Sequence, residues 1–212
     1  MRDFGKILFL SQTGKGKTYS FRNMDPSTTG FINVENKPLP FKNNFKFYGK
    51  PKTINGIIKN IKDFIENKEI NAIVIDSMSA IFEIVEEEST ANFNGYDVWS
   101  NYNNTIRDII KIIKAADKEI FVTGHYEVLN MDKSAEKRMK VLGKRWEGIV
   151  EKEFTFVMFG DAKFTKDDEG EYFFRLAGQG ISAKVPPAVF EGKNIIPNDA
   201  NEILKAIVKF YS

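Results

Sequence analysis

Residues 11–18, with the sequence SQTGKGKT, constrain the fold of this chain more than any other segment. They follow an apolar run at 7–10, which predicts a buried strand. The backbone N–H groups of a loop of small residues can surround phosphate oxygens, and the positive end of a following helix faces the same charge. We therefore expect a phosphate-binding loop between a strand and a helix that runs from about Gly16 to Arg22.

This loop matches the P-loop pattern GxxxxGK[ST] except at the first position, where Ser11 replaces glycine. Serine carries a Cβ, so it fits there only if the backbone avoids positive φ. In this pattern Lys17 reaches the β- and γ-phosphates, and the Thr18 hydroxyl holds Mg²⁺. The alternative is a surface turn rich in glycine and lysine, which its place at a strand end disfavours. The residues expected to bind the nucleotide are Ser11, Gln12, Thr13, Gly14, Lys15, Gly16, Lys17, Thr18 and Tyr19.

A second motif lies at residues 72–76, where four apolar residues end in an aspartate. This pattern predicts a buried parallel strand with a carboxylate at its C-terminal end, the edge at which open α/β sheets bind ligands. Many buried strands end in aspartate, so the motif gains its weight from the P-loop upstream. Asp76 is therefore predicted to contact Mg²⁺, either directly or through water.

The composition supports a single domain over residues 1–212. Hydrophobic residues make up 42% of the chain, enough for a sizeable core, and the net charge of +2 leaves any affinity for nucleic acid to local charge. The absence of cysteine excludes disulfides and thiolate metal sites. Without a run of 18 apolar residues or a signal-peptide layout, we expect a cytoplasmic protein with no membrane span.

Strand and helix patterns alternate along the chain, which predicts an α/β fold with a mostly parallel central sheet flanked by helices. Thr53 and Asp199 are expected to cap two of the helices, and a third carries apolar residues from Trp99 to Ile113. Strands are expected near 6–10, 30–35, 72–76, 119–123 and 154–159, followed by a more antiparallel stretch with a strand at 172–176.

Further phrases lie beside these motifs: NVENKPLP at 33–40, Asp76-Ser77, Thr123-Gly124-His125, and SAKVP at 182–186. Together they make the chain similar to the RecA-like P-loop ATPases, and most like the small phage-encoded AAA-type nucleotide-binding proteins linked to single-strand annealing and recombination. The resemblance spans nearly the whole chain. It implies one RecA-like domain with a C-terminal antiparallel extension, and an ATPase that uses ATP and Mg²⁺.

The resemblance also implies roles for two polar residues at strand ends. Glu35 follows the second strand, where a carboxylate can act as general base on the attacking water. His125, the only histidine, lies where RecA-like proteins sense the γ-phosphate and pass that state to a DNA-binding loop. The alternatives are a glutamate at the surface and a histidine that caps a helix or is merely exposed.

A basic stretch follows His125 and is expected to contact single-stranded DNA, as the corresponding loop does in RecA-like proteins. Its cations would neutralise phosphates, while the flanking Tyr126 and Trp146 would stack on bases. The alternative is a solvated helix face. The predicted DNA-binding residues are Lys133, Lys137, Arg138, Lys140, Lys144 and Arg145.

Lys184 lies in a segment rich in glycine and proline, where it is expected to reach a neighbouring subunit's γ-phosphate. Arg175 is the second choice for this finger, and the alternative for Lys184 is an exposed loop lysine.

We therefore expect a homo-oligomeric ATPase of phage DNA recombination, replication or repair in the host cytoplasm. It would act on single-stranded DNA, with a single-strand-binding or recombination protein as a further partner. A nucleotide switch without catalysis is one competing function. A small-molecule kinase is another, although the arginines form no obvious lid cluster.

Overall fold

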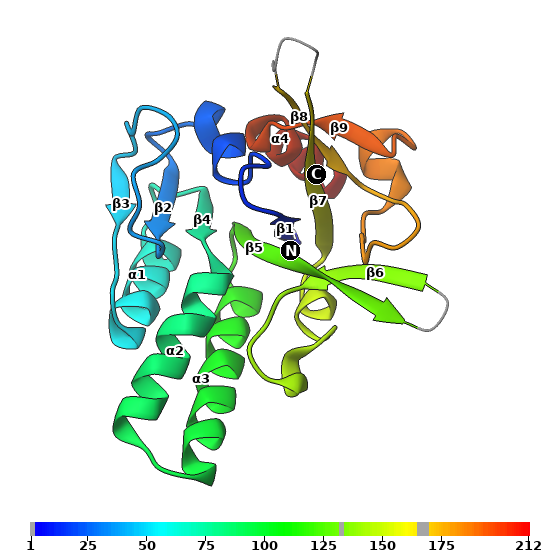
Figure 1. The fold of residues 1–212 in the computed structure, drawn as a ribbon. Coiled ribbons are helices and arrows are strands. Elements are labelled where there is room, and N and C mark those ends of the chain that lie inside the picture. Colours follow the sequence, from blue (N-terminus) through cyan, green and yellow to red (C-terminus); the bar gives the residue numbers. More distant parts are fainter. Residues whose placement is uncertain (1–2, 132–133, 165–169) are drawn as a thin grey trace.

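The computed structural model describes residues 3–131, 134–164 and 170–212, and places the described strands in one nine-stranded sheet (Figure 1). The sheet has the order β3-β2-β4-β5-β1-β7-β8-β9, with β6 paired to β5 outside this row. The first six strands of the row are parallel, β8 pairs antiparallel with β7, and β9 pairs antiparallel with β8. The strands are β1 Lys6–Ser11, β2 Thr29–Asn33, β3 Phe47–Gly49, β4 Ala72–Asp76, β5 Glu119–Met131, β6 Ser134–Met139, β7 Phe156–Phe164, β8 Gly170–Arg175 and β9 Ile195–Pro197.

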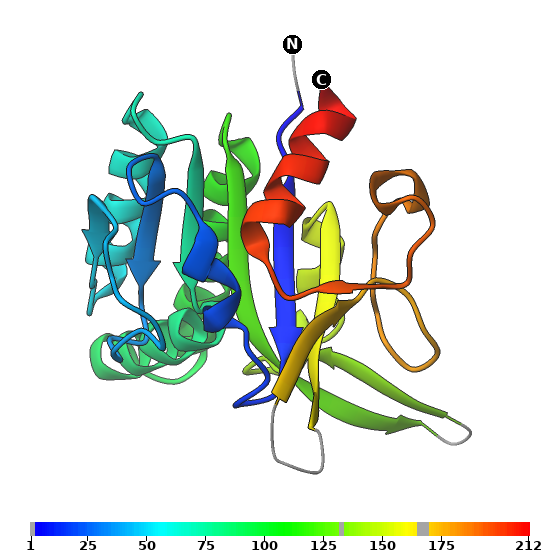
Figure 2. The same ribbon diagram turned by 90° about the horizontal axis from the view of Figure 1, so that it is seen from above.

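Helices cover both faces of this sheet, as the view from above shows (Figure 2). The helices α1 (Ile54–Glu66), α2 (Met78–Asn92) and α3 (Tyr96–Ala115) pack on one face, against Leu8 and Leu10 of β1. The helix α4 (Ala200–Tyr211) and the 3₁₀ helix η1 (Thr18–Asn23) pack on the other, against Ile7 and Phe9. Both faces of β1 are thus buried, which explains why its apolar residues follow one another without alternation. The fold is the mixed α/β architecture that the sequence predicts, with a mostly parallel central sheet flanked by helices and antiparallel strands towards the C-terminus.

The strand register brings the predicted site residues to one edge of the sheet. Ser11 at the end of β1 pairs with His125 of β5, and Asn33 at the end of β2 pairs with Asp76 of β4. Since these strands are parallel, their carboxyl ends meet at the same edge. The strand β5 lies between β1 and β4, so the phosphate loop and Asp76 are separated by one strand.

The predicted helix caps are present, and one helix was missed by the sequence analysis. Thr53 accepts a hydrogen bond from Gly56 N at the start of α1, and Asp199 caps α4. Helix α2 was not predicted, although Ser77 caps it. Its weak sequence signal has a physical origin, because an acidic run lies in its second half.

The helix predicted from about Gly16 to Arg22 is the 3₁₀ helix η1, which begins at Thr18 and ends at Asn23. The chain turns after it at Asp25, whose carboxylate accepts hydrogen bonds from Ser27 N and from the hydroxyls of Ser27 and Thr28. The following Pro26 also disfavours helical backbone at the residue before it.

The strand predicted at 119–123 continues to Met131 and pairs with β6 as an antiparallel hairpin. Residues 134–139 of the predicted basic stretch are therefore a strand of a β-hairpin and not a helix face, whereas Lys144 and Arg145 lie in a short 3₁₀ helix. The strand predicted at 154–159 likewise extends to Phe164, because β8 pairs with it along its whole second half. The short strands β3 and β9 were not predicted.

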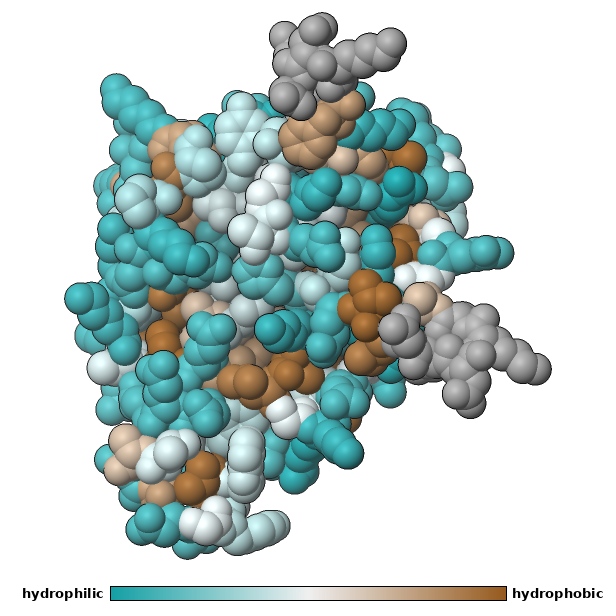
Figure 3. All heavy atoms as spheres, viewed as in Figure 1, coloured by the Kyte–Doolittle hydropathy of each residue, from teal (hydrophilic) through white to brown (hydrophobic). Residues whose placement is uncertain are grey.

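The exposed surface carries no single dominant apolar area on the face shown in Figure 3, where hydrophilic residues surround separate apolar patches. Within the described parts of the chain, no helix has the length and hydropathy needed to cross a bilayer.

Replacing Tyr102 by Phe should lower the free energy of unfolding by about 1–3 kcal/mol. The Tyr102 side chain is 1% exposed, and its hydroxyl donates to Leu142 O at 2.7 Å, so the variant leaves that carbonyl without its partner. Chemical denaturation measures the change. Tyr96→Phe is the matched control, since Tyr96 is 84% exposed and should change stability by less than about 0.5 kcal/mol. Equal effects of the two changes would contradict the anchoring role of Tyr102.

Candidate nucleotide-binding site

The phosphate loop leaves β1 through residues that suit a tight turn. Gly14 and Gly16 have φ of 76° and 79°, a region that favours glycine. Ser11 is still part of β1 and fully buried, so the condition for a serine at this position is met. Its Cβ faces Gly160 of β7, where an added Cβ would lie only 3.2 Å away.

The two lysines of the loop point to different places. Lys17 is 8% exposed, and its Nζ lies 3.4 Å from Ser11 O and 3.3 Å from His125 Nδ1. Burial lowers the pKa of Lys17, an effect that the charges of Asp76 and Glu35 partly oppose. The Lys15 ammonium instead lies 3.6 Å from Asp161 on β7. Only Lys17 therefore presents its charge to the inside of the loop.

Thr18 and Asp76 form the oxygen pair expected for Mg²⁺. The Thr18 hydroxyl donates to Asp76 Oδ2 at 2.8 Å, and the Thr123 hydroxyl donates to Oδ1. Burial raises the pKa of Asp76, which is 3% exposed, while these two hydrogen bonds oppose the rise. A nearby cation would favour the ionised carboxylate further.

These two oxygens fit Mg²⁺ only if a ligand completes the shell. In the described parts of the chain, no group of three or more acidic, histidine or cysteine side chains could hold a metal alone. Magnesium bound to nucleotides uses one or two protein oxygens together with phosphate oxygens and water, which matches this donor set.

Glu35 lies two residues beyond β2, and both of its carboxylate oxygens accept hydrogen bonds. Oε1 accepts from Ser77 Oγ and Oε2 from Lys37 Nζ, each at 3.0 Å. Burial would raise the pKa of Glu35, but the hydrogen bonds from Lys37 and Ser77, together with the charges of Lys37 and Lys17, outweigh it and lower the pKa. The carboxylate is thus ionised and next to the phosphate loop.

His125 connects the phosphate loop to the hairpin. Burial and the neighbouring charge of Lys17 lower its pKa, so the ring is neutral near pH 7 and its Nδ1 can accept from the Lys17 ammonium. Its backbone N–H donates to Ser79 Oγ, and its carbonyl accepts from Lys140 N at 2.8 Å. A movement of the Lys17 ammonium could therefore reach Lys140, just after β6, through His125 alone.

A cavity of about 630 Å³ joins these groups, a volume in the usual range for small-ligand sites. Tyr19 and Tyr172 border it with ring centroids 5.9 Å apart, and a planar base can stack on such rings. The sequence analysis missed Tyr172 and Lys37, because β8 lies far along the chain and a lysine near a loop carries no distinctive signal. The lining residues are Thr13, Gly14, Gly16, Lys17, Thr18, Tyr19, Glu35, Lys37, Pro40, His125, Gly170 and Tyr172.

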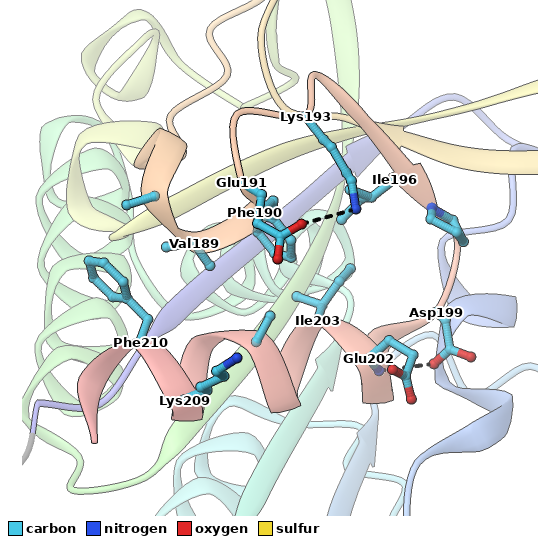
Figure 4. Close-up of a pocket in the computed structure, with 13 residues that line it drawn as sticks. Val189, Phe190, Glu191, Lys193, Ile196, Asp199, Glu202, Ile203, Lys209 and Phe210 are labelled. Carbon is cyan, nitrogen blue, oxygen red and sulfur yellow. Dashed lines mark hydrogen bonds and ion pairs between the residues drawn. The ribbon is translucent and has the colours of Figure 1, made fainter.

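A cavity of similar volume, about 650 Å³, lies between the 3₁₀ helix η4 (Pro187–Phe190) and α4 (Figure 4). Val189, Ile196 and Ile203 line it, and Lys193 pairs with Glu191 at 3.5 Å on its border. None of the predicted site residues borders this cavity, so the cavity beside the phosphate loop is the candidate nucleotide site.

The predicted DNA-binding residues do not share one face. Lys137 and Arg138 are successive residues of β6 and point to opposite sides. Lys137 Nζ lies 5.0 Å from the Tyr126 ring centroid, and Arg138 pairs with Glu136 at 2.7 Å. Lys140 is exposed just after β6, Lys144 and Arg145 are exposed in the 3₁₀ helix η2 (Lys144–Trp146), and Lys133 lies outside the described residues.

Trp146 does not fit the predicted stacking role. It is 6% exposed, and its indole N–H donates to Asn103 Oδ1 at 2.9 Å, so it packs into the core. That expectation from the sequence is wrong, because the large indole ring gains more by burial against α3 than by exposure.

Lys184 lies against its own subunit. Its ammonium donates to Phe154 O at 2.8 Å, and its main chain exchanges hydrogen bonds with Val157 at 2.8 and 3.0 Å. The segment is therefore fixed beside β7, and the finger role of Lys184 stays a prediction. Arg175 pairs with Asp161 at 3.6 Å.

No family model and no curated protein matches this sequence. Many solved structures are similar to the chain in fold. One is a KaiC-like protein, PH0186, from the hyperthermophilic archaeon Pyrococcus horikoshii OT3. It is 13% identical, with 81% of this chain and 77% of that chain covered and a TM-score of 0.49. The likeness is too distant to assign an activity.

Replacing Lys17 by Ala should abolish detectable binding of a nucleoside triphosphate while the fold is retained. The variant removes the cation at the loop interior together with its contacts to Ser11 O and His125 Nδ1, while the apolar side chains of both cores stay in place. Titration calorimetry with ATP and Mg²⁺ measures the effect. Lys15→Ala is the control in the same loop, because its ammonium lies at Asp161, and it should bind within a few-fold of the wild type. Wild-type affinity in a folded Lys17→Ala protein would contradict the P-loop assignment.

Proposed function

We propose that this chain binds ATP with Mg²⁺ in the cavity beside the phosphate loop and hydrolyses it. One observation supports this most. Lys17, Thr18 and Glu35 line one cavity at a single sheet edge, and Asp76 lies next to it in hydrogen-bond contact with Thr18.

In the proposed reaction, Lys17 and the loop amides would hold the β- and γ-phosphates, and Thr18 and Asp76 would hold Mg²⁺, whose charge would offset that of the phosphates. A water oxygen attacks the γ-phosphorus in line with the bond to the bridging oxygen. As the new P–O bond forms, the bond to the bridging oxygen breaks and ADP leaves. Glu35 accepts the proton of the water, and His125 contacts Lys17 at the position where the γ-phosphate is sensed.

We further propose that the setting is DNA recombination, replication or repair, with single-stranded DNA at the β5–β6 hairpin. The half-buried cations Lys137 and Arg138 on this hairpin and the exposed cations after it support the proposal, together with the hydrogen bond from Lys140 N to His125 O. A homo-oligomer, a finger at Lys184, a single-strand-binding or recombination partner, and a phage origin rest on the resemblance of the sequence motifs.

A second function, a nucleotide switch without turnover, is favoured by the engagement of both Glu35 oxygens. A steady-state assay of phosphate release from ATP and GTP, with and without single-stranded DNA, separates the two. Tight ATP binding without turnover under any condition would support the switch, and phosphate transfer to an acceptor other than water would support a kinase.

Replacing Glu35 by Gln should preserve ATP binding and lower turnover by about 10²-fold or more, the usual scale for loss of a general base. The amide keeps the shape of the side chain but cannot accept the proton. Glu69→Gln is the matched control, because Glu69 also pairs with a lysine, Lys46, but lies outside the cavity. Unchanged turnover in Glu35→Gln would place the base on another residue.

Removing charge from the hairpin should weaken binding of single-stranded DNA and reduce its dependence on salt. Each lost phosphate contact should lower the slope of log affinity against log salt by about 0.7, so Lys137→Ala with Lys140→Ala should lower it by about 1.4. Fluorescence anisotropy at several salt concentrations measures this slope. Lys205→Ala on α4 is the control, since its ammonium pairs with Glu202. A slope that stays at the wild-type value would place DNA binding elsewhere.

A further inference from the structure

Lys37 borders the nucleotide cavity and has no role in the function proposed so far. Its side chain is 76% exposed, and its Nζ lies 3.0 Å from Glu35 Oε2. We propose that Lys37 is a cation that acts within its own subunit. When a triphosphate binds, its ammonium moves from Glu35 to the γ-phosphate, so that nucleotide binding itself frees the carboxylate. This inference rests on the proposed function.

The backbone that carries Lys37 is fixed by side chains rather than left as a free loop. Asn33, which is 1% exposed, donates from its amide to Lys37 O and to the Tyr48 hydroxyl, each at 2.7 Å. Asn36 adopts a left-handed conformation with φ of 57°, and its amide donates to Val34 O and Pro51 O, each at 3.0 Å.

These hydrogen bonds fix the backbone of the turn that carries the long Lys37 side chain. The Lys37 main chain is held at the end of β2, whereas its ammonium is exposed at the border of the cavity. Because the Lys37 backbone is already fixed, its exposed ammonium can change partners at little cost in free energy.

The Glu35 carboxylate and a γ-phosphate differ in how strongly they attract the Lys37 ammonium. In the unliganded protein the ammonium has the Glu35 carboxylate within hydrogen-bond distance. A terminal phosphate carries more negative charge than a carboxylate and offers three strong acceptor oxygens. A γ-phosphate held by Lys17 and the loop would therefore compete well for Lys37 across the same cavity.

The exchange has a consequence for Glu35. While Lys37 donates to Oε2 and Ser77 donates to Oε1, each carboxylate oxygen already has a donor. The departure of Lys37 leaves Oε2 open to accept a hydrogen bond from water while Ser77 still orients the group. Because ADP has no γ-phosphate, it would leave the pair of Lys37 and Glu35 intact.

An alternative is that the pair is an ordinary exposed ion pair, which contributes little to stability or function. The two possibilities differ in nucleotide selectivity. An ordinary ion pair predicts that loss of Lys37 changes neither ADP nor triphosphate binding. The proposed exchange predicts a loss confined to ligands with a γ-phosphate.

The test compares Lys37→Ala, Lys37→Arg and the control Lys46→Ala, which removes an exposed lysine paired with Glu69 outside the cavity. Calorimetry gives affinities for ADP and for a non-hydrolysable ATP analogue, each with Mg²⁺, and phosphate release gives turnover. For Lys37→Ala we expect ADP affinity within about 2-fold of wild type and analogue affinity about 10-fold weaker. Turnover should fall by about 10²- to 10³-fold, the scale of one lost transition-state donor.

The Lys37→Arg protein should retain most of the selectivity for the triphosphate, and Lys46→Ala should match wild type throughout. The proposal is overturned if Lys37→Ala matches Lys46→Ala, or if it loses ADP and analogue affinity equally. A wild-type protein that binds neither nucleotide would instead overturn the proposed function. If the wild type binds without turnover, the comparison of ADP with the analogue still decides the role of Lys37.

Discussion

The carboxylate of Asp76 is the group on which the site depends, because it connects three strands that the sheet order separates. It ends β4, accepts from Thr123 on the adjacent β5, and also accepts from Thr18 beyond β1, on the far side of β5. A carboxylate that is 3% exposed is costly without such donors. Thr18 and Thr123 supply these donors. The bond from Thr18 also holds this loop residue next to Asp76, so that both oxygens could bind the same Mg²⁺.

The departure from the P-loop pattern at Ser11 is accommodated by a neighbouring strand. The glycine usually found at this position leaves space beside the strand exit, and here that space comes from Gly160 on β7. A Cβ on Gly160 would approach the Ser11 Cβ to 3.2 Å, a tight contact, so the glycine on β7 leaves room for the serine. The absence of a side chain at Gly160 therefore makes room for the Ser11 side chain where the loop leaves β1.

The sequence predicted those features that depend on a residue type at a strand end. Lys17, Asp76 and Glu35 each follow an apolar run, and parallel strands bring such positions together. Features set by tertiary contacts were not accessible. The β5–β6 hairpin arises because strands extend beyond the sheet, and the burial of Trp146 depends on Asn103 of α3. Tyr172 enters the site only through the antiparallel pairing of β8.

The C-terminal extension and the β2 end border opposite sides of the cavity, and they differ in how firmly they are held. On the first side, Asn198 donates to Gly16 O and accepts from Arg22, and the Tyr172 ring packs against Gly16 so closely that an added Cβ would lie 2.8 Å from it. These contacts fix the phosphate loop before any ligand binds, as a preorganised anion site requires. On the second side, the fixed turn at Asn36 carries the exposed Lys37 side chain. If a nucleoside triphosphate binds here as proposed, it would meet a fixed loop and one exposed cation, so we expect the response to the γ-phosphate at the end of β2, near Glu35.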